Sequence, residues 1–584
     1  MKGPALPRVK FPTLNEALDA AARSPLGLVF VDAAERETRV PWAQVYARAR
    51  RTAAGLSRLG VKPGERVALL LPTSPGFMDA FFGTLLAGAV PVPLYPPVRL
   101  GRLEEYHRST ARMLEMSGAT LVLTDAKVRL LLGAPVAAAR PRLGCHTVDE
   151  VSRETGDMAR TATAQALALI QFSSGSTVDP KPVALRHDNL MAQLAALEAE
   201  LPPPEDRAPV GVSWLPLYHD MGLIGCLLSA LYYPGGMVLI PPEVFLARPA
   251  LWPRALSRHR GFVSPAPNFA YGLCLKRVKD AEMEGVDLSG WRHALNGAEP
   301  VSLETLRRFS ERFARWGFQA GAMRPVYGLS EASLAVTFPV AGRGPHSLGV
   351  DGRVLATERR AVEGSRRVVS VGRPMPGFEV QVRDMLGHEL PERQVGRVFA
   401  RGPSIMEGYF GHPEATVRAL DEAGWLDTGD LGFEADGELF LTGRAKDLVI
   451  IRGANHAPQE FEESLEGVDG LRQGCAVALG FTPEGEQDEV LLVLAEHAPG
   501  ASVDGLEERV REAVAGTGVR PHTVRILEPG TLPRTSSGKL RRGEALRRFL
   551  ADELTAPKKV RAVGLVVEMA RSALAFARAG REES

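Results

Sequence analysis

Short apolar runs alternate with longer amphipathic stretches in the first part of the chain, and this alternation is the strongest constraint on its fold. The runs at 67–72, 120–125 and 166–172 have the length and composition of strands, whereas 77–89 and 187–201 have apolar residues at helical spacing. Strand–helix alternation predicts a mostly parallel sheet covered by helices. With 584 residues, the chain is also too long for one ordinary core, so we expect at least two domains.

The pattern changes from about Val380, where VQVRD, GRVFARG and GELFLTGR predict the short strands of an antiparallel or barrel-like part. After Gly443 the chain starts again with the strands and helices of a small α+β unit. We therefore predict an N-terminal domain at 1–443, a hinge at 444–447 and a C-terminal domain at 448–584. The stretch 560–579 has helical spacing, and we expect a helix packed on the small domain rather than one lying on a membrane surface.

Composition excludes several classes of protein. Lys and Arg total 70 against 69 for Asp and Glu, so the net charge of +1 gives no reason to expect nucleic-acid binding. The four cysteines form no CxxC pair, which fits a reducing compartment without disulfides or a zinc site. The N-terminus lacks an apolar signal region, and no run reaches the ~18 apolar residues of a membrane span. These features predict a cytoplasmic protein without a transmembrane segment.

The segment SSGSTVDPK at 173–181 directly follows the strand-like run 166–172 and is the strongest local motif. Its Ser, Gly and Thr residues allow a tight turn whose backbone N–H groups and hydroxyls face phosphate oxygens, and Lys181 adds positive charge. The motif is not a Walker A loop, because GxxxxGK[ST] is absent. Taken alone, an ordinary surface turn explains it equally well.

The segment RPVYGLSEAS at 324–333 offers a carboxylate and an aromatic ring. Mg²⁺ prefers oxygen ligands and takes one or two carboxylates beside substrate phosphates, which is a role open to Glu331. The ring of Tyr327 can stack on a purine. The alternative is a Glu that complements a helix dipole next to a core tyrosine.

Three further charged residues stand in later motifs. Asp430, in WLDTGDLGF, can accept hydrogen bonds from both ribose hydroxyls, although a simple Asp-Gly turn also explains it. Arg444, in GRAKDLVIIRG, can contact ribose or phosphate. Lys539, in PRTSSGKLRR, can bring a cation to a developing negative charge. For Arg444 and Lys539 the alternative is a solvated basic stretch.

Taken together and in order, these motifs resemble the adenylate-forming, or AMP-binding, superfamily over nearly the whole chain. The matching segments are SSGSTVDPK, WLPLYHDMG, NGAEP, YGLSE, LDTGD, GRAKD and PRTSSGK. AGAVPVPLYPP, RPMPGFEV and KDLVIIRGANHAPQEFE are most similar to the fatty acyl-AMP ligases. The long stretch 338–371 stands where those ligases carry a family-specific insertion, which is associated with poor transfer to coenzyme A.

The resemblance implies an α/β fold. A large N-terminal domain of stacked, mostly parallel α/β subdomains with a small barrel-like β part precedes a small mobile α+β domain. It implies ATP and Mg²⁺, with the metal held by Glu331 and Thr177. It also implies that Lys539 is catalytic, that His219 lies near the acyl carboxylate, and that Lys446 is the hinge residue. The implied nucleotide-binding residues are Ser173, Ser174, Gly175, Ser176, Thr177, Lys181, Gly297, Ala298, Tyr327, Gly328, Asp430 and Arg444.

The implied reaction joins a fatty acid to AMP, releases pyrophosphate and passes the acyl group to a carrier protein or to a carrier domain of a polyketide or peptide synthase. The apolar run 223–240 is expected to line part of an acyl tunnel. The basic residues of 534–548 predict either a docking face for an acidic carrier protein or a solvated basic helix.

The phosphate loop departs from the usual pattern, because Val178 and Pro182 replace two glycines and stiffen the loop. This departure leaves open a non-catalytic protein that binds a nucleotide or an acyl-adenylate. A fatty acyl-CoA ligase is a further alternative, because it differs only in the thiol acceptor and the stretch 338–371 separates the two by resemblance alone.

Overall fold

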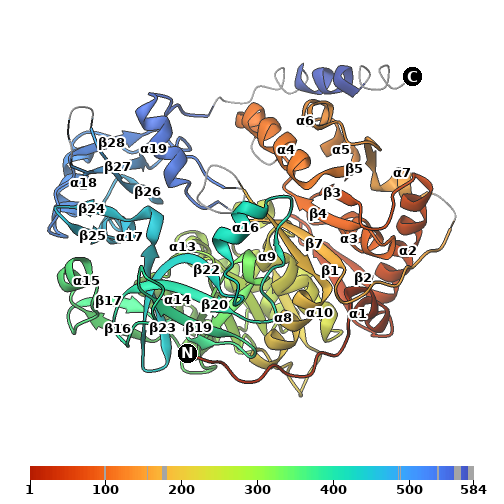
Figure 1. Cartoon of the computed structure of the whole chain (residues 1–584), viewed down its shortest axis with the longest axis horizontal. Coiled ribbons are helices and arrows are strands. Elements are labelled where there is room, and N and C mark those ends of the chain that lie inside the picture. Colours follow the sequence, from red (N-terminus) through yellow and green to blue (C-terminus); the bar gives the residue numbers. More distant parts are fainter. Residues whose placement is uncertain are drawn as a thin grey trace.

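The computed structural model describes residues 1–97, 100–153, 156–173, 180–483, 486, 488–535, 538–557 and 567–576. Its largest sheet has seven strands, parallel except for β2 at one edge (Figure 1). In spatial order these are β13 (Met323–Pro325), β12 (His293–Asn296), β11 (Val263–Ala266), β9 (Val210–Ser213), β10 (Gly236–Leu239), β1 (Gly27–Val31) and β2 (Glu37–Pro41).

A second sheet has four strands, all parallel, in the order β4 (Val90–Leu94), β3 (Arg66–Leu70), β5 (Ala119–Thr124) and β6 (Cys145–Thr147). Strand β3 alternates between two cores. Val67 and Leu69 pack into the main core with α3 (Pro75–Leu86), whereas Ala68 and Leu70 face the second core with α4 (Leu103–Ser117). A strand has period 2, so burial on both faces requires a continuous apolar run and helices on both sides. The prediction of a covered, mostly parallel sheet is confirmed.

The strand before the phosphate loop is an exception to the predicted pattern. β7 (Leu167–Phe172) pairs antiparallel with β8 (Pro182–Arg186), which also pairs antiparallel with β21 (Gly408–Tyr409). The loop at 173–181 thus joins the two strands of a hairpin, and α8 (His187–Glu200) follows only after β8. Placing this strand in the parallel sheet was wrong, because a nine-residue connection closes a hairpin without a crossover helix.

The β part is an open antiparallel sheet of β19 (Glu379–Arg383), β20 (Gly396–Arg401), β22 (Leu426–Ala435) and β23 (Glu438–Arg444). The expected barrel-like closure is not found among the described residues. The stretch 338–371 folds as a hairpin of β16 (Ser347–Val350) and β17 (Arg366–Val369), with α15 (Gly352–Glu358) between them. The hairpin and helix share a small core with β22 and β23.

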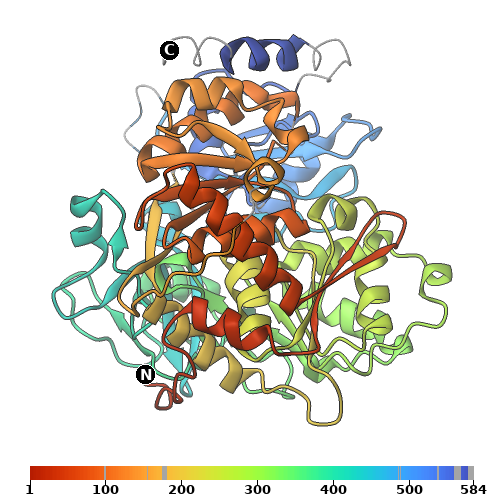
Figure 2. The ribbon, with the colours of Figure 1, turned by 90° about the vertical axis from the view of Figure 1, so that its right-hand side faces the viewer.

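The last part of the chain is a separate α+β unit, shown in blue in Figures 1 and 2. Its sheet places β27 (Val490–His497) between β26 (Leu471–Phe481), antiparallel, and β28 (Thr523–Leu527), parallel. Two cores cover the sheet, one with α18 (Leu506–Ala515) and one with α19 (Arg542–Leu550). The hairpin of β24 (Val449–Ile451) and β25 (Ala454–His456) and helix α17 (Pro458–Glu463) connect it to the rest.

The described part of the C-terminal tail, residues 567–576, is helical and lies against α6 (Gly133–Ala139) of the N-terminal region (Figures 1 and 2). The Gly133 N–H donates to Ser572 Oγ at 2.7 Å, and Phe576 packs on the core of the four-stranded sheet. The expectation that this helix packs on the small domain was wrong, because Ser572 and Phe576 contact the N-terminal region, while Val567 and Leu574 are exposed. Within the described residues, no helix is long and apolar enough to cross a membrane.

Candidate active site

A cleft of 3940 Å³ runs between the two large sheets, the antiparallel β part and the C-terminal unit. Every predicted site residue that the structure describes lines it. These are Ser173, Lys181, His219, Gly297, Ala298, Tyr327, Gly328, Glu331, Asp430, Arg444, Lys446 and Lys539. Ser174, Gly175, Ser176 and Thr177 lie outside the described residues. Motifs spread over more than 350 positions of the sequence therefore meet in one place.

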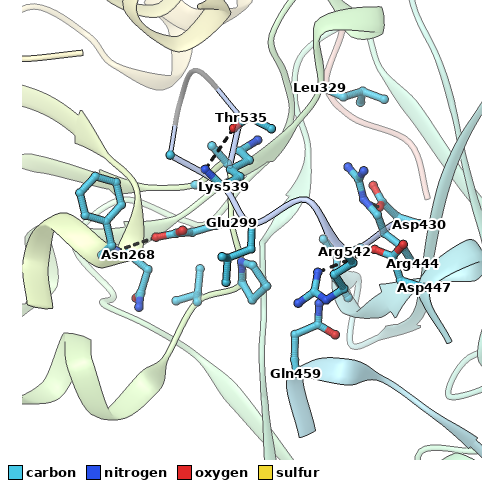
Figure 3. Close-up of a pocket in the computed structure, with 18 of the residues that line it drawn as sticks. Asn268, Glu299, Leu329, Asp430, Arg444, Asp447, Gln459, Thr535, Lys539 and Arg542 are labelled. Atoms are coloured by element: carbon cyan, nitrogen blue, oxygen red, sulfur yellow. Dashed lines mark hydrogen bonds and ion pairs between the residues drawn. The ribbon is translucent and has the colours of Figure 1, made fainter. Parts of the chain in front are cut away.

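Asp430 is the acceptor at one end of the cleft. The register of β22 and β23 places Asp430 opposite Arg444, whose Nε donates to Asp430 Oδ1 at 3.0 Å (Figure 3). The buried Tyr327 hydroxyl donates to Asp430 Oδ2 at 2.7 Å. The charge of Asp430 raises the pKa of Arg444, and burial raises the pKa of Tyr327 well above its ordinary value. The carboxylate is thus held from two sides and has a fixed orientation toward the cleft.

Backbone rather than side chains forms the wall beside Tyr327. A Cβ on Gly297 would lie 2.9 Å from Val326 Cγ2, and one on Gly328 would lie 1.8 Å from the Leu334 carbonyl oxygen. Ala298 has a φ of +71°, a left-handed conformation that costs free energy in any residue except glycine. Neighbouring residues of the protein occupy both Cβ positions, so only glycine fits at 297 and 328 and the wall carries no side chain at either position.

Lys181 and Glu331 are linked by a residue that the sequence analysis missed. The Lys181 Nζ lies 4.4 Å from the centre of the Tyr409 ring, and the Tyr409 hydroxyl donates to Glu331 Oε1 at 2.9 Å. Tyr409 reaches this point because β21 pairs with β8, next to the end of the phosphate loop. The sequence around Tyr409 gives no signal of this pairing, since the two strands are more than 200 residues apart.

Lys539 comes from the C-terminal unit and points into the cleft between Glu299 and the Asp430–Arg444 pair (Figure 3). Its loop is closed locally, because the Lys539 N–H donates to Thr535 Oγ1 at 3.1 Å and the Thr535 N–H donates to the Lys539 carbonyl at 2.8 Å. Burial lowers the pKa of Lys539, while the charges of Asp220, Glu299 and Asp430 oppose that shift. The ammonium is therefore desolvated and surrounded by carboxylates.

His219 is the N-cap residue of α9 (Asp220–Gly222) and also lies in the cleft. Burial lowers its pKa to about 4, and the charge of Lys539 acts in the same direction, whereas Asp220 opposes it. The imidazole is consequently uncharged at neutral pH. The neutral imidazole has one N–H group, which can donate a hydrogen bond to a carboxylate. No change in its protonation is needed for this contact.

Asp220 and Glu299 are two more cleft residues that the sequence analysis did not select. Asp220 Oδ2 accepts from Ser330 Oγ at 2.6 Å, and Glu299 Oε1 accepts from the Phe269 N–H at 2.6 Å. Burial raises the pKa of Glu299. Both acids belong to quoted motifs, LYHDMG and NGAEP, so a search for every acid in those motifs would have found them.

The basic stretch at 534–548 is engaged within the protein. Arg542 pairs with Glu462 at 2.6 Å, and Arg548 pairs with Glu544 at 2.6 Å and with Glu105 at 2.9 Å. Arg547 also pairs with Glu544, at 2.9 Å. Arg542 and Arg548 thus link α19 to α17 and α4, and the pairs with Glu544 lie within α19, so most of the predicted basic face is neutralised.

The inserted hairpin and the hinge region contact each other. Arg366 of β17 donates to Glu460 of α17 at 3.1 Å. Ala445 and Leu448, on either side of Lys446, pack on the small core of the hairpin. Lys446 itself lies in the short helix η7 (Ala445–Asp447), and burial lowers its pKa. The segment 338–371 therefore joins the C-terminal unit to the β part.

The apolar run 223–240 lines the cleft at one residue only, Gly225. Leu223, Ile224, Leu227 and Leu228 are instead buried in the main core. The run was expected to line part of an acyl tunnel, and Gly225 is the part of it that reaches the cleft. A helix with apolar residues on every side buries most of them against protein.

Comparison with known proteins agrees with this geometry. The AMP-binding enzyme family matches residues 18–410. A protein of Caulobacter vibrioides that is named as a candidate acyl-CoA synthetase is 37% identical over 551 residues, covering 93% of this chain and 96% of its own length. A long-chain-fatty-acid–AMP ligase of Mycobacterium marinum is 33% identical over 542 residues, covering 88% of this chain and 91% of its own.

A solved structure from work on fatty acyl-adenylate ligases of E. coli and L. pneumophila superposes with a TM-score of 0.86 at 34% identity. The superposition covers 93% of this chain and 99% of that one, so both parts of the molecule match. The chain belongs to the AMP-binding enzyme family, and within that family it is similar to the fatty acyl-AMP ligases.

Proposed function

We propose that this enzyme activates a fatty acid by joining it to the AMP part of ATP, with release of pyrophosphate. The observation that carries the proposal is the position of Lys539, which enters the same part of the cleft as the fixed Asp430 carboxylate. A nucleotide bound by Asp430 would bring its phosphates toward the ammonium of Lys539.

The described residues fit ATP. Asp430 accepts hydrogen bonds from the ribose hydroxyls, because its two oxygens are already oriented by Tyr327 and Arg444. The bare wall of Gly297 and Ala298 admits the adenine ring. Lys181 supplies positive charge at the end of the phosphate loop.

Glu331 fits the role of a magnesium ligand. Its Oε1 accepts one hydrogen bond from Tyr409, which orients the carboxylate, and Mg²⁺ in nucleotide sites takes one or two carboxylates beside phosphate oxygens. Thr177, the other predicted ligand, lies outside the described residues. When bound, the metal neutralises charge on the β- and γ-phosphates.

In the proposed reaction, a carboxylate oxygen of the fatty acid attacks the α-phosphorus of ATP. The new P–O bond forms as the bond to the bridging oxygen of the β-phosphate breaks, and pyrophosphate leaves with the electron pair. Negative charge develops on the α-phosphate oxygens, where Lys539 stabilises it. The neutral His219 orients the attacking carboxylate. Positioning and charge stabilisation suffice, so no covalent bond to the protein is needed.

We further propose that the acyl group passes to the phosphopantetheine thiol of an acyl carrier protein or synthase carrier domain. The Arg366–Glu460 contact supports this choice, because it joins the inserted hairpin to the C-terminal unit that must turn for the second step. Transfer to coenzyme A is the second candidate, which the name of the Caulobacter relative favours. With either acceptor, we expect the protein to act in the cytoplasm.

The test measures pyrophosphate release and acyl-AMP by mass spectrometry, with ATP, Mg²⁺ and a series of fatty acids. Half the samples receive coenzyme A and half receive a holo acyl carrier protein. We expect acyl-AMP that accumulates in the presence of coenzyme A and is consumed by the carrier protein. Consumption by coenzyme A favours the second candidate, and ATP binding without pyrophosphate release with any acid contradicts both.

A further inference from the structure

The position of Lys539 depends on how the C-terminal unit docks on the rest of the molecule. Lys539 lies between β28 and α19 of that unit, whereas Asp430 belongs to β22 of the N-terminal region. The chain enters the C-terminal unit through residues 444–447. A connection of a few residues leaves the orientation of such a unit to its noncovalent contacts. Two of these contacts, both made by the start of α4, lie on either side of the segment that carries Lys539.

Arg102 joins the start of α4 to the residues that lead into this segment. Its Nη2 donates to the carbonyl oxygens of Gly530 at 3.0 Å and of Thr531 at 2.9 Å. The Arg102 side chain is 17% exposed and lines the cleft. Because the N–H groups of a guanidinium point in fixed directions, this contact orients the backbone of the segment as well as holding it.

Glu105, one helical turn further along α4, contacts the other side of the same segment. Its Oε1 pairs with Arg548 of α19 at 2.9 Å and with Arg541, the N-cap residue of α19, at 3.9 Å. Arg102 Nη1 donates to Glu105 Oε2 at 3.5 Å, so the two α4 residues also contact each other. The segment that carries Lys539 is therefore held on both sides by the first turn of α4.

The first turn of α4 is itself firmly placed. Leu103 and Tyr106 are buried in the core of the four-stranded sheet. Residues three positions apart lie on the same side of a helix, so Arg102 and Glu105 share a neighbouring side, which faces the cleft. The contacts with the C-terminal unit thus come from a fixed edge of the N-terminal region.

We propose that Arg102 and Glu105 are positioning residues for adenylation, which dock the C-terminal unit in the orientation that brings Lys539 to the α-phosphate of ATP. Both act through Lys539 and need no contact with the substrate. This inference rests on the proposed function, since it assumes that Lys539 acts in adenylation.

The kinetic test is the fatty-acid-dependent exchange of labelled pyrophosphate into ATP by the full chain. Arg102→Ala and Glu105→Arg should each lower kcat about tenfold, the shift expected from the loss of hydrogen bonds to a charged group. The KM for ATP should stay within about threefold of the wild type, because Asp430 belongs to the N-terminal region. The stoichiometry of ATP binding, measured by calorimetry, should not change, whereas a misfolded variant binds ATP in only a fraction of its chains.

A second measurement follows docking without any chemistry. Spin labels are attached to Arg108→Cys in α4 and Arg525→Cys in β28, which are exposed positions, while the four native cysteines are buried. Pulsed electron spin resonance should give one distance in this protein and a second, longer distance when Arg102→Ala or Glu105→Arg is added. An unchanged distance distribution in both cases would show that the unit docks without these contacts, and would overturn the inference.

The matched controls are on the same helix. Arg108→Ala removes an arginine and Glu104→Arg reverses a glutamate at exposed positions outside the cleft. Both should leave kcat unchanged, and Glu104→Arg should also leave the spin-label distance unchanged.

The failure of this inference and the failure of the proposed function give different results. An unchanged kcat in both Arg102→Ala and Glu105→Arg, with an active wild type, removes the role of these two residues but leaves the proposed function intact. A wild-type protein that exchanges no pyrophosphate with any fatty acid removes the proposed function, and with it the role of these residues in adenylation.

Discussion

Asp430 illustrates how much of the site depends on single residues. Its two oxygens accept from Tyr327 and Arg444, which belong to different elements, so its orientation does not depend on a bound nucleotide. Lys539 differs in this respect. It reaches the cleft from the C-terminal unit, and the charged groups that shift its pKa belong to other elements. In the proposed function, Asp430 would prepare the nucleotide site and Lys539 would complete it.

Replacing Asp430 with Asn should weaken ATP binding. The amide keeps its size but loses the charge that Arg444 and the ribose hydroxyls require, and hydrogen bonds to a charged group contribute about 1.5–3 kcal/mol. We therefore expect the KM for ATP to rise roughly 10- to 100-fold in steady-state kinetics. Asp436→Asn is the matched control, because Asp436 is an exposed residue between the same two strands. A KM within twofold of the wild type for Asp430→Asn would contradict the ribose assignment.

The buried environment of Lys539 predicts a pH dependence. Burial lowers the pKa of this lysine below its ordinary value of about 10.4, and the reaction needs the protonated form. As pH rises, kcat/KM should therefore decline at a lower pH than the pH at which an exposed lysine loses its proton. His219, with a pKa of about 4, should cause no loss between pH 7 and 5.

Lys539→Arg provides the check on this pH profile, because a guanidinium stays protonated throughout the accessible range. Its residual activity should lack the alkaline decline. An identical decline in the arginine variant would assign the titration to another group.

Sequence patterns selected several charged residues that line the cleft, but missed Asp220, Glu299 and Tyr409. Asp430, Arg444 and Lys539 carry functional groups whose type suits the chemistry, so they were recognisable from motifs. Tyr409 was missed because its role depends on the pairing of β21 with β8, a contact between distant segments. The residue type shows what a side chain can do, whereas only the fold shows which neighbour it meets.

Among the elements, the inserted hairpin of β16 and β17 contacts α17, which leads from the β part into the C-terminal unit. Its neighbouring arginines face different ways. Arg366 reaches Glu460 of α17, whereas Arg367 stays within the hairpin and contacts only Ser347 among its hydrogen-bond partners in the described residues. Consecutive residues of a strand point to opposite faces, which explains the difference.

Arg366→Ala should loosen the C-terminal unit, and Arg367→Ala should not. We expect faster amide hydrogen exchange at 444–447 in the first variant, because a partly buried ion pair that restrains the hinge is lost. The two substitutions remove the same side chain from adjacent positions, so they form a matched pair. Equal exchange rates at the hinge in both variants would show that the insertion does not restrain it through this contact.

Apolar runs predicted which segments of the sequence form strands, but not whether those strands pair in parallel or antiparallel. The run 166–172 forms a strand, as predicted, yet β7 belongs to an antiparallel sheet. An apolar run buried on both faces looks the same in parallel and antiparallel surroundings, so the direction of pairing depends on the connection and on distant strands. The open shape of the antiparallel β part could not be predicted for the same reason.

At the scale of the whole molecule, the chain beyond residue 447 contacts the N-terminal region at other places besides the connection at 444–447. The C-terminal unit follows the N-terminal region through residues 444–447, and the tail then returns to the N-terminal region at α6. A Cβ on Gly133 would lie 2.2 Å from the Ser572 carbonyl oxygen, so a larger residue cannot keep the tail helix in place.

Gly133→Val should therefore release the tail. We expect limited proteolysis to remove the residues after Pro557 faster than in the wild-type protein, while the remaining fragment stays intact. Gly76→Val, near the start of α3, is a suitable control, since Gly76 has no positive φ and its Cβ would meet only Ser74 Oγ, at 3.7 Å. Both are substitutions of glycine by a small apolar residue. Equal rates of tail cleavage in the two variants would contradict the packing of residues 567–576 on α6.

The central claim is that Lys539 completes a site for adenylation of a carboxylic acid. The most direct measurement is the fatty-acid-dependent exchange of labelled pyrophosphate into ATP, for the wild type, Lys539→Ala and Lys62→Ala, a control at an exposed lysine outside the cleft. The account predicts exchange in the wild type and in Lys62→Ala, and a loss of roughly 10²–10³-fold in Lys539→Ala, similar to the removal of one charge-stabilising group at a transition state. Undiminished exchange in Lys539→Ala, or none in the wild type with any fatty acid, would contradict it.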